Sequence, residues 1–165
     1  MAGALIVTAE MAPPDLAWLN DLRRRFYPSE RNQLPAHLTM FHAIVPSAEL
    51  ELRQILRTME TLPAPRAWIA GAMDLGGGVA LRVTSDELDA IRYEIAERLH
   101  GLLTAQDSVG WSAHVTIQNK VAPKVARALI KALGDVRRPI GISGLGLHRY
   151  LGGPWETVRT FPFRG

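Results

Sequence analysis

The chain has 165 residues, enough for one domain with a buried core, and its 47% hydrophobic and 21% charged residues exclude a disordered or collagen-like protein. The 19 Lys and Arg against 16 Asp and Glu leave a net charge of only +3, which is compatible with an anionic ligand but not with a protein that coats nucleic acid. Cysteine is absent, so disulfides, thiolate metal sites and a catalytic thiol are excluded. Together with a first segment typical of a strand, not of a signal peptide or membrane span, this predicts one cytoplasmic domain over 1–165.

The first half of the chain predicts two strands and two helices. The β-branched run at 4–8 is typical of a buried strand, and two prolines then begin a helix that ends at Pro28. The stretch AHLTMFHAIV at 36–45 has the composition of a second strand. We expect Ser47 to begin the next helix. The apolar stripe of that helix consists of Leu52, Ile55, Leu56 and Met59.

The second half predicts a hairpin, two helices and three further strands. The glycines at 76–78 join the two strands of the hairpin, because glycine supplies the positive φ angles of a tight turn. Ser85 begins the longest helix, which we expect to reach about Leu103. The stretch WSAHVTIQNKV at 111–121 is a strand, and a proline-initiated helix and two closing strands follow. Adjacent strands with irregularly placed helices favour an α+β fold with antiparallel pairing over a doubly wound parallel sheet.

A short motif occurs in two of these strands, as AHLTM and, far along the chain, as AHVTI. Residues two apart in a strand share a face, so His37 lies beside Thr39, and His114 beside Thr116, while the intervening apolar residues point to the core. An alternative interpretation is a pair of half-buried strands with polar outer faces, since threonine is common in strands. The shared alanine and the shared apolar positions make the pair more specific than one such triplet.

The residue types in this motif suit the cleavage of a phosphodiester. If the two strands face each other across a cleft, a neutral histidine can take a proton from water while a protonated one gives a proton to the leaving oxygen. The threonine hydroxyls can stabilise charge on the phosphate oxygens. The protein itself supplies these functions, and no histidine spacing of the H-x-H or H-x-x-x-H kind is present, so we expect neither a metal nor a cofactor.

The two motifs resemble the H-x-T-hydrophobic signatures of the 2H (two-histidine) phosphoesterases, the superfamily of the 2′-5′ RNA ligase and cyclic phosphodiesterase proteins, and the chain is most similar to the short bacterial members. The resemblance spans nearly the whole chain. It implies an α+β fold of two pseudo-symmetric lobes, with antiparallel sheets that line a central cleft and helices outside. By residue it implies His37 and His114 as acid and base, in an order that the sequence leaves open, and Thr39 and Thr116 as phosphate-binding groups.

For function, the resemblance implies metal-independent hydrolysis of 2′,3′-cyclic phosphate or 2′-5′ phosphodiester bonds of RNA ends or nucleotides. One alternative is a module that binds an RNA end or nucleotide without turning it over. A second is 2′-5′ RNA ligation, the reverse of hydrolysis through the same acid–base pair. A third is a structural partner protein in which the two motifs coincide by chance. We expect a nucleotide or RNA end as partner, no membrane and a monomer.

Four further residues are candidates for contacts with the substrate. His42 is separated from His37 by an odd number of positions, which places it on the opposite face of a regular strand, so it is a weaker candidate. Gln118 and Lys120 follow the second motif and are candidates for binding phosphate or a base, or for a solvated turn. Tyr150 is a candidate for stacking on a nucleobase, although such residues are often part of the core. The other aromatic candidates for stacking are Trp111, Trp155 and Phe161.

Overall fold

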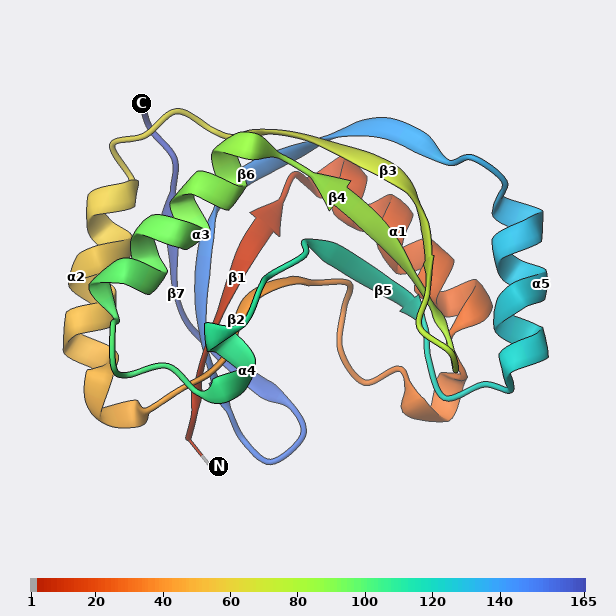
Figure 1. Cartoon of the computed structure of the whole chain (residues 1–165), viewed down its shortest axis with the longest axis horizontal. Helices are drawn as coiled ribbons and strands as arrows, with labels where there is room; N and C mark the ends of the chain where they lie inside the picture. Colours follow the sequence, from red (N-terminus) through yellow and green to blue (C-terminus); the bar gives the residue numbers. More distant parts are fainter. Residues whose placement is uncertain (1–2) are drawn as a thin grey trace.

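The computed structural model describes residues 3–165, which form seven strands, five α-helices and two short 3-10 turns (Figure 1). The strands are β1 (Leu5–Met11), β2 (Leu38–Ile44), β3 (Arg66–Asp74), β4 (Val79–Thr84), β5 (His114–Gln118), β6 (Arg137–Tyr150) and β7 (Trp155–Pro162). The helices are α1 (Pro13–Phe26), α2 (Glu49–Met59), α3 (Asp86–Arg98), α4 (Ala105–Ser108) and α5 (Pro123–Leu133), with 3-10 turns η1 (Ser29–Arg31) and η2 (Pro46–Ala48). None of the described helices has both the length and the apolar character needed to cross a membrane.

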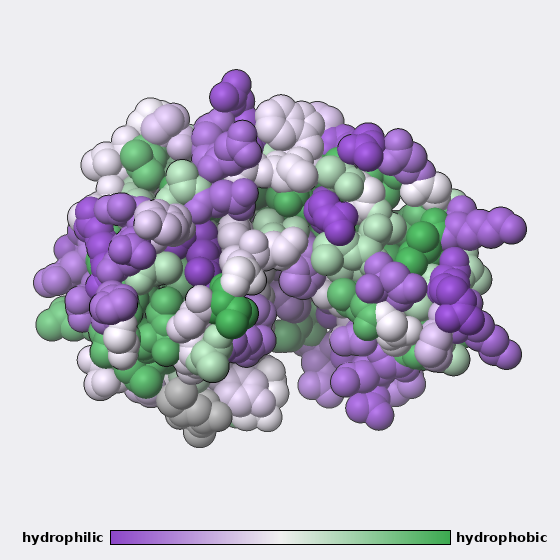
Figure 2. Space-filling view, in the orientation of Figure 1, coloured by the Kyte–Doolittle hydropathy of each residue, from purple (hydrophilic) through white to green (hydrophobic). Residues whose placement is uncertain are grey.

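The strands form an antiparallel sheet in the order β2-β1-β6-β3-β4-β5, with β7 paired to β6, which confirms the predicted α+β class. The 14-residue strand β6 belongs to both halves of the sheet. Its segment 137–141 pairs with β3, and its segment 142–149 pairs with β1. In Figure 1, α2 and α3 lie towards one end of the molecule and α5 lies at the other. Figure 2 shows the surface hollowed between the two halves, towards the lower edge of the view.

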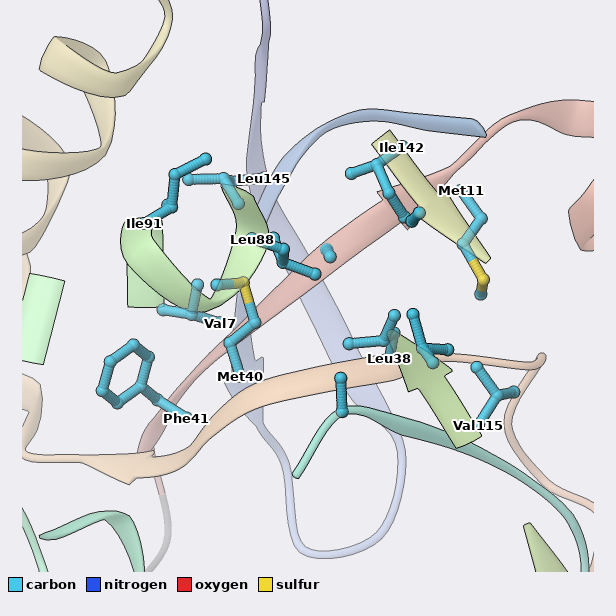
Figure 3. Packing of buried hydrophobic residues seen from close by; sticks show 14 of the residues in the cluster. Val7, Met11, Leu38, Met40, Phe41, Leu88, Ile91, Val115, Ile142 and Leu145 are labelled. Carbon is cyan, nitrogen blue, oxygen red and sulfur yellow. The ribbon is translucent and has the colours of Figure 1, made fainter. Parts of the chain in front are cut away.

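The apolar backs of the two H-x-T strands anchor both of them in the core. Leu38 and Met40 of β2, and Val115 and Ile117 of β5, have no exposed surface. Each such side chain contributes about 1.5–3 kcal/mol on burial. Figure 3 shows Leu38 and Val115 in the same apolar cluster, so the two strands share one core. Because side chains alternate along a strand, this burial turns the His and Thr positions outward.

Two helix boundaries differ from the sequence expectation. The helix capped by Ser85 ends at Arg98 and does not reach Leu103, because Gly101 has a φ of +83°, a left-handed conformation that terminates helical hydrogen bonding. Leu103 instead forms an isolated β-bridge with Ile44. Ser47 does not begin α2; it lies within the 3-10 turn Pro46–Ala48, and α2 starts only after it.

Candidate active site

The strands that carry the two H-x-T motifs lie at opposite ends of the sheet order, yet they contact each other. Side chains from outside the two strands bind the backbone of both motifs. The indole Nε1 of Trp111, which precedes β5, donates a hydrogen bond of 3.1 Å to the carbonyl oxygen of Thr39 in β2. The guanidinium of Arg23, in α1, donates a hydrogen bond of 2.8 Å to the carbonyl oxygen of Thr116 in β5. Trp111 therefore ties the segment before β5 to β2, and Arg23 fixes β5 on the helix that packs against it.

Both motif histidines are oriented by the same local hydrogen bond. The Nδ1 of His37 lies 2.8 Å from the carbonyl oxygen of Pro35, and the Nδ1 of His114 lies 2.8 Å from that of Ser112. A carbonyl oxygen only accepts, so Nδ1 carries a proton in each ring. The Nε2 atom of each histidine is then the nitrogen that gains and loses a proton. Both side chains are partly exposed, as proton exchange with a substrate requires.

The motif threonines are available to a ligand. Thr39 and Thr116 are partly exposed, unlike their fully buried neighbours in the strands. Within residues 3–165, neither hydroxyl has a hydrogen-bond partner, although the backbone carbonyl of each residue does. A free hydroxyl beside an oriented imidazole can donate to an oxygen of a bound phosphate.

The surroundings of His37 favour its neutral form. Burial is the largest cause that lowers the pKa of His37, and the nearby charges of Arg23, His148 and His114 lower it further. The hydrogen bond to the Pro35 carbonyl opposes this shift without reversing it.

A cavity of about 320 Å³ opens beside His37. The ring of Trp155, from β7, lies 4.8 Å from the His37 ring and 5.5 Å from the ring of His148, measured between centroids. The remaining polar residues on the cavity wall are Thr8, Glu10, Thr157 and Thr160. The sequence alone assigned no role to these four polar residues. The signal for some of them was present, since Thr8 and Glu10 occupy alternate positions of an otherwise apolar strand.

Two buried arginines connect the helices to the motif strands. Arg23 and Arg92 are only 3% and 8% exposed. Arg23 extends from α1, which follows β1, to β5, whereas Arg92 extends from α3, which follows β4, to the carbonyl oxygen of Met40 in β2, at 3.2 Å. In the sequence, Arg23 resembles one residue of a basic helix end. Its spacing of four residues from the buried Leu19 was the signal that it lies on the inner face of α1.

The four additional candidates lie outside the cavity beside His37. His42 is exposed on β2, and its Nδ1 lies 3.2 Å from a carboxylate oxygen of the buried Asp107. Register shifts on both sides of Val7 in the β1–β2 pair make β2 irregular, so the rule for alternate faces does not apply to His42. The placements of the other three are as follows: Gln118 is 3% exposed, Lys120 is exposed with a φ of 62°, and Tyr150 ends β6 opposite Trp155.

The described carboxylate and imidazole groups do not form a metal site. Among residues 3–165, no group of three or more His, Asp or Glu side chains is arranged to hold a metal ion. The site as described consists of two oriented imidazoles, two free hydroxyls and a cavity on the side of His37.

Comparison with known proteins identifies the family. A model of the 2′-5′ RNA ligase superfamily matches residues 12–154, which include both H-x-T motifs, so the chain belongs to this superfamily of 2H phosphoesterases. This membership supports an enzyme of the phosphoesterase type. A search of curated protein sequences found no match.

Solved structures share the fold over the full chain. The protein TT0787 of Thermus thermophilus is 18% identical, with a TM-score of 0.69 and 98% of both chains covered. The LigT protein of E. coli, in a structure described as complexed with 3′-AMP, is 12% identical, with a TM-score of 0.67 and all of both chains covered. A protein described as a phosphoesterase is 11% identical, with a TM-score of 0.65 and 99% of both chains covered. At these identities, the likeness concerns the fold.

Proposed function

We propose that the protein is a phosphodiesterase that hydrolyses 2′,3′-cyclic phosphate or 2′-5′ phosphodiester bonds of nucleotides or RNA ends, with His37 and His114 as its acid–base pair. One observation carries the proposal: each histidine has Nδ1 fixed by a carbonyl two residues earlier, and the strands β2, which His37 directly precedes, and β5, which begins with His114, are in contact. A matched pair of oriented imidazoles with free Nε2 atoms suits two coordinated proton transfers.

In the proposed reaction, water attacks phosphorus and the bond to one ribose oxygen breaks. Neutral His37 takes the proton of the attacking water at Nε2, and protonated His114 gives the proton at its Nε2 to the leaving ribose oxygen. The hydroxyls of Thr39 and Thr116 donate to the non-bridging oxygens, where charge accumulates in the transition state. Exchange of one proton with solvent at each histidine then restores the starting state.

The assignment of His37 as base follows from its surroundings. Its lowered pKa keeps the imidazole neutral at pH 7, which is the state that a general base needs. A guanidinium stays charged throughout the working range, so Arg23 opposes protonation of His37 at every pH of interest. His114 is then the acid by complement.

The nature of the substrate is supported by the relatives. LigT structures are described as complexed with 3′-AMP, with ATP and with phosphate, so that protein accepts nucleotides and the phosphate group alone. The threonine hydroxyls and histidines of this chain offer the same kind of contacts to a phosphate. We therefore propose a nucleotide or an RNA end as substrate.

The test is turnover of a panel of nucleoside 2′,3′-cyclic phosphates and 2′-5′ dinucleotides in the presence of EDTA. We expect hydrolysis to persist in EDTA and to be lost in both His37→Ala and His114→Ala. The matched control is His100→Ala, because His100 is exposed and lies in the loop after α3. Abolition of turnover by EDTA, or wild-type rates in both histidine variants, would refute the mechanism. Nucleotide binding without any turnover would identify a binding module instead.

A further inference from the structure

A chain of hydrogen bonds on the cavity wall ends at the Glu10 carboxylate. The hydroxyl of Thr8 donates to Oε1 of Glu10 at 3.0 Å, so the Thr8 oxygen is free to accept from Nε2 of His148, 2.8 Å away. The same Nε2 lies 3.4 Å from Oε1 of Glu10, and the Nδ1 of His148 accepts from the hydroxyl of Thr157 at 3.1 Å. This proton order satisfies a neutral His148 on both nitrogens. These hydrogen bonds therefore hold the Glu10 carboxylate in place through Oε1 and leave Oε2 available to a ligand.

Glu10 is held in its charged form. The Nε2–H of His148, which also faces Oε1 at 3.4 Å, is the largest cause that lowers the pKa of Glu10; the hydrogen bond from Thr8 lowers it further, and together they outweigh the opposing effect of burial. The network packs directly over Gly146, where a Cβ atom would lie 2.7 Å from both Thr8 Oγ1 and His148 Nε2. Glycine at this position is what gives the polar group its room in the sheet.

The cavity has the chemistry of a site for a hydrogen-bond donor, not for a second phosphate. Glu10 is the one carboxylate among the described residues that line the cavity, and neither Lys nor Arg is among them. The Glu10 side chain keeps 32% of its surface exposed. Trp155 and the aliphatic side chains of Leu16 and Leu34 give the wall a flat, apolar character that suits an aromatic ring.

We propose that this cavity binds the nucleobase of the substrate and that Glu10 selects guanine. Guanine presents two adjacent donors, N1–H and the N2 amino group, which match the two oxygens of a carboxylate. The corresponding edges of adenine and cytosine place an acceptor nitrogen next to a single amino group, and uracil has one N–H between two carbonyls. The proposal rests on the proposed function, because it places the phosphate between the two histidines and the base on the His37 side.

The experiment compares kcat/KM for the 2′,3′-cyclic phosphates of guanosine, inosine and adenosine. A charge-assisted hydrogen bond predicts a preference for guanosine over adenosine of roughly 10- to 100-fold, with inosine, which lacks the N2 amino group, in between. Glu10→Gln replaces one acceptor oxygen by a donor and brings the guanosine-to-adenosine ratio to within about threefold of unity. The matched control is Glu156→Gln, since Glu156 is an exposed carboxylate on β7 outside the cavity lining; it keeps the wild-type ratio.

A binding measurement separates this proposal from the proposed function. Calorimetry on the wild-type protein and on Glu10→Gln with the 2′-monophosphates of guanosine and adenosine requires no turnover. Tighter binding of the guanosine compound that depends on Glu10 supports the base site, even if no cyclic phosphate is cleaved. Equal cleavage and equal binding of all bases, or a guanosine preference that survives Glu10→Gln, would overturn the base site and leave the hydrolase proposal standing.

Discussion

The segments that carry His37 and His114 have the same motif and the same 2.8 Å bond from Nδ1 to a carbonyl, but their surroundings differ. His37 lies on the wall of a cavity next to Trp155, whereas the lining of this cavity contains neither His114 nor Thr116. The shared features supply two equivalent imidazoles. The differences lower the pKa of His37 and give its side of the site a cavity, which is where we propose that the nucleoside binds.

The side chains that hydrogen-bond to the backbones of β2 and β5 are also alike in part and different in part. Arg23 of α1 donates to a carbonyl of β5, and Arg92 of α3 donates to a carbonyl of β2. Behind β5, Arg23 also donates to the side chain of Asn32 at 3.1 Å. Behind β2, the charged Asp107 accepts the backbone N–H groups of His42 and Ala43. A carboxylate therefore anchors one strand, and a neutral amide contributes to the anchoring of the other.

The largest expected effect tests whether the two histidines have different roles. His37→Ala and His114→Ala should each reduce kcat by roughly 10²- to 10⁴-fold on a nucleoside cyclic phosphate. On a phosphodiester with a nitrophenol leaving group, which departs without a proton, His114→Ala should recover most of its rate while His37→Ala stays impaired. Steady-state kinetics on both substrates provides the measurement. Recovery in His37→Ala instead would reverse the assignment of acid and base.

The next effect concerns the two buried arginines, Arg23 and Arg92. Arg23→Ala leaves the Thr116 carbonyl without its donor, and Arg92→Ala does the same to the Met40 carbonyl. Each should lower the free energy of unfolding by about 3 kcal/mol, because both side chains are buried and hydrogen-bonded. Urea titration followed by circular dichroism measures this. Arg24→Ala is the control, since that side chain is 66% exposed, and it should change stability by less than about 0.5 kcal/mol.

A smaller effect concerns the carboxylate that anchors β2. Hydrogen bonds from His42 and Ala43 hold the pKa of Asp107 below its ordinary value of 3.8, although burial acts in the opposite direction. Its contribution to stability is therefore complete above about pH 4 and is lost as the pH falls through the lowered pKa. Asp107→Asn should destabilise the protein by about 1–3 kcal/mol at pH 7. The difference from wild type should shrink in acid; a difference that is constant with pH would contradict this account.

The smallest effect is a shift of the acid limb of the pH profile. Because the pKa of His37 lies below 6.5, activity should rise with pH in a limb centred below that value. Trp155→Ala opens the side of the ring to water, which should raise the His37 pKa towards 6.5 and move the limb to higher pH. NMR titration of the His37 ring checks the same shift without turnover. An unchanged titration in the variant would show that Trp155 does not shield His37.

Much of the local structure could be predicted because it depends on neighbours in the chain. Alternation predicted His37 and Thr39 on one face and Leu38 in the core; in the structure Leu38 is buried and its two neighbours are partly exposed. Prolines and a serine cap marked the starts of α1, α3 and α5. The predicted end of α3 was wrong. The apolar spacing continues beyond Gly101, but the left-handed backbone at this glycine does not allow the helix to continue.

The sequence by itself was sufficient to predict the pair of H-x-T motifs and the chemistry that their residues permit. The reason is that side chains alternate along a strand with a period of two, which decides which of them share a face. How the two motifs are tied together, and what lies beside them, depends on the three-dimensional packing. Arg23 meets Thr116 across 93 positions of the chain, and Thr8 meets His148 across 140. Contacts of this range arise from the path of β6 and the packing of helices on the sheet, and no local spacing encodes them.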